Sequence, residues 1–142
     1  MRVLIAPDSF GGTLTAAEAA GAIAAGWTGG AAHDTVTARP LSDGGPGFVD
    51  VLHATLGGTL LGVAAPDPLG RAVPATVLLV GDTAYVESAQ ACGLHLLAPD
   101  ERDPMGTTSY GVGVLIAAAV EAGATTVVVG LGGSGVNDGG AL

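Results

Sequence analysis

The sequence of 142 residues contains no lysine, and its four arginines stand against 13 acidic residues, for a net charge of −9. Proteins bind nucleic acids and anionic lipids by neutralising phosphates with Lys and Arg, so this balance argues against both as partners. A nucleotide is still compatible with the charge, because backbone N–H groups and a divalent cation can hold its phosphates. The lack of lysine also excludes the P-loop motif GxxxxGK[ST].

Cysteine pairs, histidine clusters and long apolar runs are missing as well. Cys92 has no second cysteine to pair with, so we expect the reducing environment of the cytoplasm and a packing role for its side chain. The three histidines are scattered without the spacing of a zinc site. The longest apolar run, 112–120, falls far short of the roughly 20 residues that span a bilayer, so we expect no membrane segment.

The sequence does contain enough Val, Leu, Ile and Ala to fill the core of one domain, with 25 glycines placed between the apolar segments. The opening residues RVLIA predict a short strand that stops at Pro7. Thr15 and Glu18 have the spacing of a capping box, which predicts a helix that runs to about residue 27. A second strand over 35–41 and a second helix over 47–56 repeat this order.

Between residues 59 and 87, three β-type runs are separated by the turn signals PDPLG and GD, which predict a meander of hairpins. A helix over 108–122 and a strand over 125–129 follow. These patterns indicate an α/β fold with a Rossmann-like parallel sheet and a β-rich insertion. They divide the chain into an α/β part (1–58), a β-rich segment or the start of a second subdomain (59–98), and a part with the last helix, strand and glycine loop (99–142).

Three strand ends run into glycine-rich polar turns: APDSFGGT, PLSDGGPG and GLGGSGVNDGG. In an open α/β sheet, ligands bind beyond the carboxyl ends of the strands, so we expect the three turns to converge on one crevice. Glycine lets the backbone turn and present N–H groups to an anion. Asp8, Asp43 and Asp138 could hold Mg²⁺ or position a substrate hydroxyl, and this mixture of groups suits phosphoryl transfer.

Each turn also has a plainer interpretation. Glycine turns with Asp or Asn are common connectors, and Asp8 and Asp43 fit the caps of the helices that follow them. The run Thr107, Thr108 and Ser109 is compatible both with a helix cap and with substrate binding. The last turn does not match the dinucleotide fingerprint GxGxxG followed by an acid about twenty residues on, so we do not expect NAD.

Seven stretches, in this order and spacing, carry a resemblance to one family: APDSFGGTLTAAEAA, PLSDGGPG, DPLGR, ESAQACGL, RDP at 102–104, TTSYGVG and GLGGSGVNDGGA. Together they resemble the bacterial glycerate kinase family, of the two-domain glycerate 2-kinase type, whose members make 2-phosphoglycerate from glycerate and ATP. The resemblance implies ATP and Mg²⁺ as cofactors and a site between two α/β domains. Family members are more than twice this long. We therefore expect the fold to be incomplete relative to the family, and the chain to be an N-terminal fragment that stops before the helix after its last strand.

The resemblance also carries over individual residues. At these positions we expect catalytic roles for Asp43, Asp138 and Asp8, with Asp43 and Asp138 either as Mg²⁺ ligands or as the groups that activate the substrate hydroxyl. The resemblance implies that Arg102 binds an anionic group of the substrate, and that the last glycine loop binds a phosphate or the glycerate carboxylate. The residues implied to bind substrate or phosphate are Ser9, Gly44, Gly45, Arg102, Thr107, Thr108, Ser109, Gly132, Gly133, Ser134, Asn137 and Gly139.

Two positions depart from the family pattern and keep other functions open. Gly11 stands where the family usually has lysine, and Pro46 stands where it usually has glutamate. The loss of a cation beside a phosphate can cost several kcal/mol of transition-state stabilisation. One alternative is therefore a catalytically inactive fragment that binds a small anion or a partner chain, and a weaker one is another small-acid-binding α/β enzyme. We also expect self-association through the sheet left uncovered after residue 129.

Overall fold

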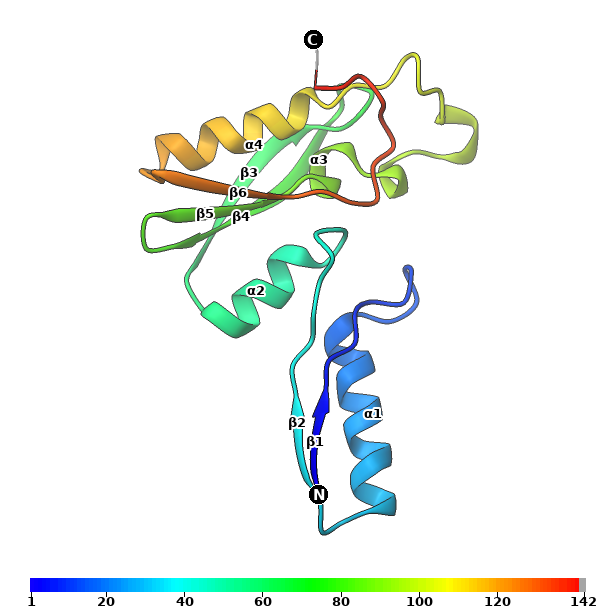
Figure 1. The fold of residues 1–142 in the computed structure, drawn as a ribbon. Helices are drawn as coiled ribbons and strands as arrows, with labels where there is room; N and C mark the ends of the chain where they lie inside the picture. Colours follow the sequence, from blue (N-terminus) through cyan, green and yellow to red (C-terminus); the bar gives the residue numbers. More distant parts are fainter. Residues whose placement is uncertain (141–142) are drawn as a thin grey trace. The chain divides into compact units, whose positions relative to one another are not determined.

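The computed structural model describes residues 1–140, which form two compact units, Met1–Asp43 and a larger one that starts at Gly44 (Figure 1). Ala141 and Leu142, at the end of the predicted segment 99–142, lie outside the described residues. The chain divisions expected at residues 58 and 98 stay predictions. None of the helices in the described part of the chain is both long and apolar enough to cross a membrane.

The first unit consists of two parallel strands and one helix. β1 (Arg2–Ile5) pairs with β2 (Thr35–Ala38), and α1 (Ala16–Gly30) contacts both strands. The order strand, helix, strand is the one that the sequence predicts. β2 is shorter than the predicted 35–41, because Pro40 has no N–H to donate to a neighbouring strand.

The start of α1 follows from its capping box. The Thr15 hydroxyl accepts a hydrogen bond from Glu18 N–H at 3.2 Å, and the Glu18 carboxylate accepts one from Thr15 N–H at 2.8 Å. These bonds satisfy N–H groups that the helix itself leaves without partners. The predicted helix start is therefore confirmed, and the helix continues to Gly30 rather than ending near residue 27.

The second unit contains a mixed sheet with strand order β3-β4-β5-β6. β3 (Thr59–Pro66), β4 (Ala72–Val80) and β5 (Thr83–Glu87) are antiparallel neighbours, as the predicted meander requires, and β6 (Thr126–Gly130) joins β5 in parallel. With one parallel and one mixed sheet, the α/β class is confirmed. The β-rich segment and the last strand share one sheet, which the sequence patterns did not indicate.

Helices lie on both faces of this sheet (Figure 1). α2 (Phe48–Leu56) contacts β4 and β5, and α4 (Tyr110–Glu121) contacts all four strands. Three short elements connect β5 to α4, and they are α3 (Ala89–Cys92), η1 (Leu94–Leu96) and η2 (Pro99–Glu101).

The core of the second unit lies between the sheet and α4. Val77, Val86 and Leu115 are fully buried there, and each such side chain contributes about 1.5–3 kcal/mol relative to an exposed one. At the carboxyl ends of the parallel pair β5–β6, Glu87 lies opposite Gly130. The segments that follow these two strands therefore start at the same edge of the sheet.

Candidate functional site

Two of the predicted glycine turns pack directly on each other within the second unit. A Cβ at Gly44 would lie 3.1 Å from Leu131 N. A Cβ at Gly130 would lie 2.7 Å from Gly44 O, and one at Gly132 would lie 2.7 Å from Gly45 Cα. Real Cβ atoms essentially never approach other atoms closer than 3.0 Å. The contact between the two backbones therefore requires glycine at these positions, whether or not the loops also bind an anion.

Pro46 extends this contact. Gly133 has a φ of +64°, and a Cβ there would lie 3.0 Å from Pro46 Cδ. The proline ring thus packs on the last glycine loop.

A buried carboxylate at the end of β5 holds the second turn in place. Glu87 is 5% exposed, and its Oε2 accepts hydrogen bonds from Gly47 N–H and Val49 N–H, each at 3.2 Å. Both N–H groups lie at the start of α2, where a helix supplies no partner of its own. A negative charge at this end also suits the helix dipole. Glu87 therefore ties the turn before α2 to the strand end beside β6.

Asp138 joins the loop after β6 to the start of α4. Its Oδ2 accepts hydrogen bonds from Ser109 N–H at 2.7 Å, Ser109 Oγ at 3.0 Å and Thr108 Oγ1 at 3.4 Å, and its Oδ1 accepts one from Gly140 N–H at 3.2 Å. The bond from Ser109 N–H foremost, with the other three, holds the pKa of Asp138 below its usual value against the opposing effect of burial. The ionised carboxylate acts as a cap for α4 that comes from outside the helix.

The middle of this loop is docked on the short helices. Gly133 O accepts a hydrogen bond from Leu94 N–H at 2.8 Å, and Gly135 N–H donates to Cys92 O at 2.8 Å. The buried Thr107 donates from its hydroxyl to Gly135 O at 3.1 Å. The loop backbone is therefore bonded on one side to α3 and η1 and on the other to the residues before α4.

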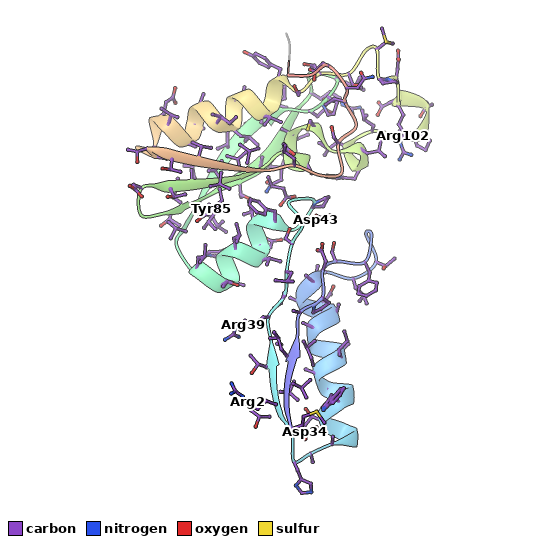
Figure 2. All side chains as sticks on the ribbon, viewed as in Figure 1. Arg2, Asp34, Arg39, Asp43, Tyr85 and Arg102 are labelled. Atoms are coloured by element: carbon purple, nitrogen blue, oxygen red, sulfur yellow. The ribbon has the colours of Figure 1, made fainter. Side chains whose placement is uncertain are left out.

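A pocket of about 240 Å³ opens where this loop faces the segment before α4. Arg102, Ser134 and Asn137 are among the residues that line it, and Ser134 Oγ donates to Val136 O at 3.3 Å within the loop (Arg102 is labelled in Figure 2). The other lining residues are Leu94, Pro104, Gly135 and Val136. The guanidinium group of Arg102 and the amide of Asn137 are donors that suit a carboxylate or a phosphate. The structure thus brings three of the predicted site residues together.

Cys92 lies next to one wall of this pocket. Its Sγ is 3.9 Å from Ser134 Oγ, and its side chain is buried. Burial raises the pKa of the Cys92 thiol, against the smaller lowering effects of Ser134 and Ser88. A neutral, buried thiol is a poor nucleophile, which agrees with the packing role expected from the sequence.

Three further predicted residues, Asp8, Ser9 and Asp43, belong to the first unit and follow its strands β1 and β2 in the sequence. Asp8 and Ser9 follow β1, and Asp8 Oδ1 accepts a hydrogen bond from Ser9 N–H at 2.6 Å. Gly11, in the same turn, has a φ of +44°. Asp43 is exposed and directly precedes the buried Gly44 (Figure 2). The convergence of all three turns on one crevice stays a prediction.

The described carboxylates can be tested against the needs of Mg²⁺. Within residues 1–140, no group of three or more His, Cys, Asp or Glu side chains is placed to hold a metal ion by itself. Mg²⁺ in nucleotide enzymes usually takes one or two carboxylates, with phosphates and waters as its other ligands. Asp138 fits this smaller role, because in the described part of the chain its Oδ1 accepts one hydrogen bond and retains a lone pair.

Sequence reasoning did not assign Glu87 to this site, nor four of the residues that line the pocket, Leu94, Pro104, Gly135 and Val136. Glu87 ends the otherwise apolar run TAYV, and an ionisable residue at the end of a buried strand was the signal that could have identified it. Leu94 ends the stretch ESAQACGL that carries the family resemblance, but a leucine in a loop does not by itself indicate that it lines a pocket.

The described residues combine an α/β frame with packed glycine loops and a pocket beside the loop after β6, an arrangement typical of the class of α/β proteins that bind small charged molecules. The sequence profile of the Glycerate kinase family matches residues 3–141. The chain therefore belongs to the glycerate kinase family, as the resemblance of its motifs indicates.

Individual relatives agree with this assignment. The glycerate 2-kinase of Escherichia coli (strain K12) is 42% identical over 143 residues, and an uncharacterised protein of Mycobacterium tuberculosis (strain CDC 1551 / Oshkosh) is 52% identical over 144 residues. Each alignment covers 99% of this chain and 38% of the relative. A crystal structure from Salmonella typhimurium LT2, described as glycerate kinase 2, matches with a TM-score of 0.78 and 40% identity over 99% of this chain and 38% of that chain. The chain thus spans 38% of the length of these relatives.

Proposed function

We propose that the chain forms part of an ATP-dependent glycerate kinase that converts glycerate to 2-phosphoglycerate. The observation that carries the proposal is the pocket in which Arg102, Ser134 and Asn137 meet beside the docked glycine loop. Membership of the glycerate kinase family supports a kinase. The name of the E. coli relative, glycerate 2-kinase, supports the 2-hydroxyl as the phosphoryl acceptor.

The pocket suits a small hydroxy acid in both size and charge. Its volume is about 240 Å³. That is enough space for a three-carbon acid. Arg102 would bind the carboxylate through two parallel N–H···O bonds. Asn137 would donate to the remaining oxygens of the acid, and Ser134 would do so if its hydroxyl turned away from Val136 O.

The glycine loops would bind the phosphates of ATP through backbone N–H groups. Gly133 and Gly139 each have a φ of +64°, a conformation in which neighbouring N–H groups can face an anion. Bound Mg²⁺ would neutralise charge on the β- and γ-phosphates, with Asp43 and Asp138 as its protein ligands.

One carboxylate would have to orient the attacking hydroxyl group. Asp8, Asp43 and Asp138 are the candidates for this role. The chosen carboxylate accepts the hydroxyl proton while the substrate oxygen attacks the γ-phosphorus in line with the departing ADP.

A chimera tests the proposal, because the chain matches only part of its relatives. Residues 1–142 replace the corresponding part of the E. coli glycerate 2-kinase, and ADP release is measured with and without glycerate. We expect glycerate-dependent ADP release, with 2-phosphoglycerate identified by ³¹P NMR. Asp43→Asn and Asp138→Asn should each lower kcat by about 10²-fold. Asp50→Asn, an exposed acid on α2, is the matched control and should stay within about threefold of the parent. If both test variants stay within about threefold as well, the assigned roles are wrong.

A catalytically inactive chain that binds a small anion is the second candidate. Pro46 favours it, because this residue packs on Gly133 where the family usually has glutamate. A chimera that folds and binds glycerate but releases no ADP would support this candidate. Activity recovered by Gly11→Lys and Pro46→Glu together would then identify the cause.

We also propose a cytoplasmic protein without nucleic-acid partners, on the grounds of its single cysteine and its net charge of −9. Self-association is proposed at β6, which is an edge strand among the described residues and carries Val128 at 40% exposure. Light scattering of the chain over a range of concentrations measures it, and a constant monomer mass would contradict it.

A further inference from the structure

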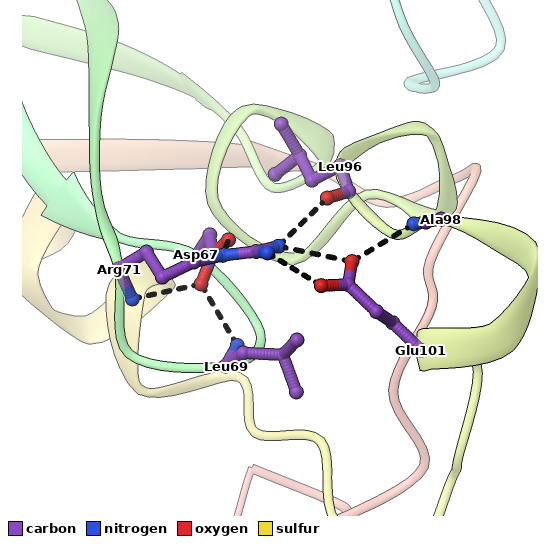
Figure 3. Close-up of polar contacts among 6 residues, drawn as sticks. All are labelled: Asp67, Leu69, Arg71, Leu96, Ala98 and Glu101. Carbon is purple, nitrogen blue, oxygen red and sulfur yellow. Dashed lines mark hydrogen bonds and ion pairs between the residues drawn. The ribbon is translucent and has the colours of Figure 1, made fainter.

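The motif DPLGR forms a charged cluster that the proposed reaction does not use. Arg71 Nε lies 2.6 Å from Asp67 Oδ2, and the two terminal nitrogens of Arg71 bind Glu101 Oε1 at 2.7 Å and Oε2 at 3.3 Å (Figure 3). Arg71 thus pairs with two carboxylates, one of them through the paired hydrogen bonds that favour Arg over Lys. We call Asp67, Arg71 and Glu101 the Arg71 bridge.

Asp67 fixes the near end of the bridge. It is 1% exposed, and its Oδ1 accepts hydrogen bonds from Leu69 N–H at 2.8 Å and Arg71 N–H at 2.9 Å. Burial by itself would raise the pKa of Asp67, but the hydrogen bonds from Arg71 and Leu69 outweigh burial and lower it. The turn between β3 and β4 therefore closes around a charged carboxylate, and Arg71 extends from this turn in a fixed direction.

The far end of Arg71 joins the two short helices beside the pocket. A terminal nitrogen donates to Leu96 O at 3.1 Å, in the last residue of η1, while Glu101 is the last residue of η2. Leu94, the first residue of η1, and Arg102, the residue after η2, both line the pocket. The bridge therefore connects two pocket-lining segments to one turn of the sheet.

Glu101 also determines the backbone on both sides of Arg102. Its carboxylate accepts a hydrogen bond from Ala98 N–H at 2.9 Å, which closes η2. Its carbonyl oxygen accepts one from Asp103 N–H at 2.9 Å, and Asp103 Oδ1 in turn accepts one from Met105 N–H at 2.9 Å. Glu101 thus bonds to the backbone at Ala98 before Arg102 and at Asp103 directly after it.

We infer that the Arg71 bridge positions Arg102 and thereby sets the affinity of the pocket for the carboxylate of a small acid. The inference rests on the proposed function, because it takes the pocket as the site of the acid. A flexible arginine binds an anion better when its backbone is fixed in advance, since less conformational entropy is lost on binding.

The negative charge of Glu101 lets the direction of the change in affinity distinguish a positioning role from simple charge repulsion. A carboxylate beside an anion site repels the ligand, so its neutralisation alone should strengthen binding. If Glu101 acts by positioning Arg102, Glu101→Gln should weaken binding instead. Asp100 is exposed on the same short helix and is not part of the bridge, so Asp100→Asn is a matched control for the change in charge.

The experiment measures the Kd of the 142-residue chain for glycerate by calorimetry at low salt. We expect Glu101→Gln to weaken binding roughly 3- to 10-fold and Asp100→Asn to leave it unchanged or tighten it. Arg102→Gln should weaken binding about tenfold or more. In the Arg102→Gln background, Glu101→Gln should cause no further loss, because the bridge acts through Arg102.

The outcomes separate the inference from the proposed function. Equal affinities of the parent and Arg102→Gln would refute the pocket as the acid site, and both ideas with it. A loss in Arg102→Gln with unchanged or tighter binding in Glu101→Gln would overturn the inference alone. The inference would also be overturned if Glu101→Gln weakened binding by the same factor in the Arg102→Gln background as in the parent. That result is expected if Glu101 has only a structural role. If Glu101→Gln does not fold, Arg71→Lys replaces it with the same expectations, because lysine keeps the charge but loses the paired hydrogen bonds.

Discussion

At the scale of single residues, Asp138 connects the candidate site to the fold. Its carboxylate accepts hydrogen bonds from Ser109 and Thr108 at the start of α4, and the same side chain is proposed to meet the nucleotide. A change at this residue should therefore alter stability as well as activity, and the two effects can be separated by pH.

Asp138→Asn should lower the melting temperature at pH 7, because the amide lacks the charge that favours the N-terminus of α4. The pKa of Asp138 is lowered in the folded chain, so its carboxylate stabilises the fold above its ordinary pKa of 3.8, and this contribution is lost as pH falls through the lower folded value. The difference in melting temperature between parent and variant should therefore begin to narrow below about pH 4 and continue to narrow as the pH falls further. Thermal melts followed by circular dichroism from pH 3 to pH 7 measure this.

The control for this melt series is Glu121→Gln, at the opposite end of the same helix. Glu121 is exposed, and a negative charge at a helix C-terminus is unfavourable, so its removal should leave the melting temperature unchanged or raise it. If Asp138→Asn and the parent have the same melting temperature at pH 7, Asp138 does not act as a cap.

The site residues stay predictions, but the signals behind them differ. Asp138 stands in a glycine turn after a strand, which is a local signal, whereas Ser134 and Asn137 are implied by the family resemblance. The Arg71 bridge had no such signal, because Arg71 and Glu101 lie 30 residues apart and meet through the packing of two turns. Residues that act through tertiary hydrogen bonds cannot be read from spacing alone.

At the scale of elements, α4 combines two glycines with opposite requirements. A Cβ at Gly111 would lie 2.0 Å from Pro66 O and 2.9 Å from Ala91 Cβ, whereas a Cβ at Gly113 would have no atom within 4 Å. Gly111 therefore allows α4 to approach β3 and α3 closely, while Gly113 is exposed on the opposite side.

Gly111→Ala should lower the free energy of unfolding by about 1–3 kcal/mol, because the new methyl group overpacks a buried contact. Gly113→Ala, two residues away in the same helix, is the matched control. It should raise the free energy of unfolding by roughly 0.5–1 kcal/mol, since alanine is the better helix former. Urea denaturation of both variants measures the difference. Equal effects would show that α4 does not pack on the sheet in this way.

Most elements could be predicted from the sequence because their signals are local. The Thr15 capping box and the PDPLG turn each identify an end of a helix or strand to within a few residues. The short elements α3, η1 and η2 could not be predicted, because segments of three or four residues carry no periodicity. α3 and η1 are held by the loop after β6, which bonds to Cys92 and Leu94, whereas η2 is held by the bonds between Glu101 and Arg71.

At the scale of the whole molecule, the two units have very different cores. The buried apolar residues of the first unit are Ile5, Ala16, Ala19 and Ala20, whereas the second unit buries many larger side chains. Small side chains remove little apolar surface from water, and a unit of about 40 residues seldom supplies enough burial to be stable on its own. The first unit should therefore open more readily than the second.

Hydrogen–deuterium exchange measures this difference. We expect the amides of α1 to exchange at least about tenfold faster than those of α4. Local helix signals favour the reverse order, because α1 has a full capping box and is the longer helix. Equal or stronger protection of α1 would show that its small core is not the limiting factor.

The contact between the two glycine loops also limits which amino-acid substitutions this sequence can accept during evolution. Neighbouring core residues commonly exchange volume over time, as one becomes larger while the other becomes smaller. Gly44, Gly130 and Gly132 contact the backbone of the facing loop, and glycine is already the smallest residue, so none of them can become smaller. A larger residue at one of these positions therefore cannot be offset by a smaller residue at the facing one. The two loops, although far apart in the chain, constrain each other's sequence at this contact.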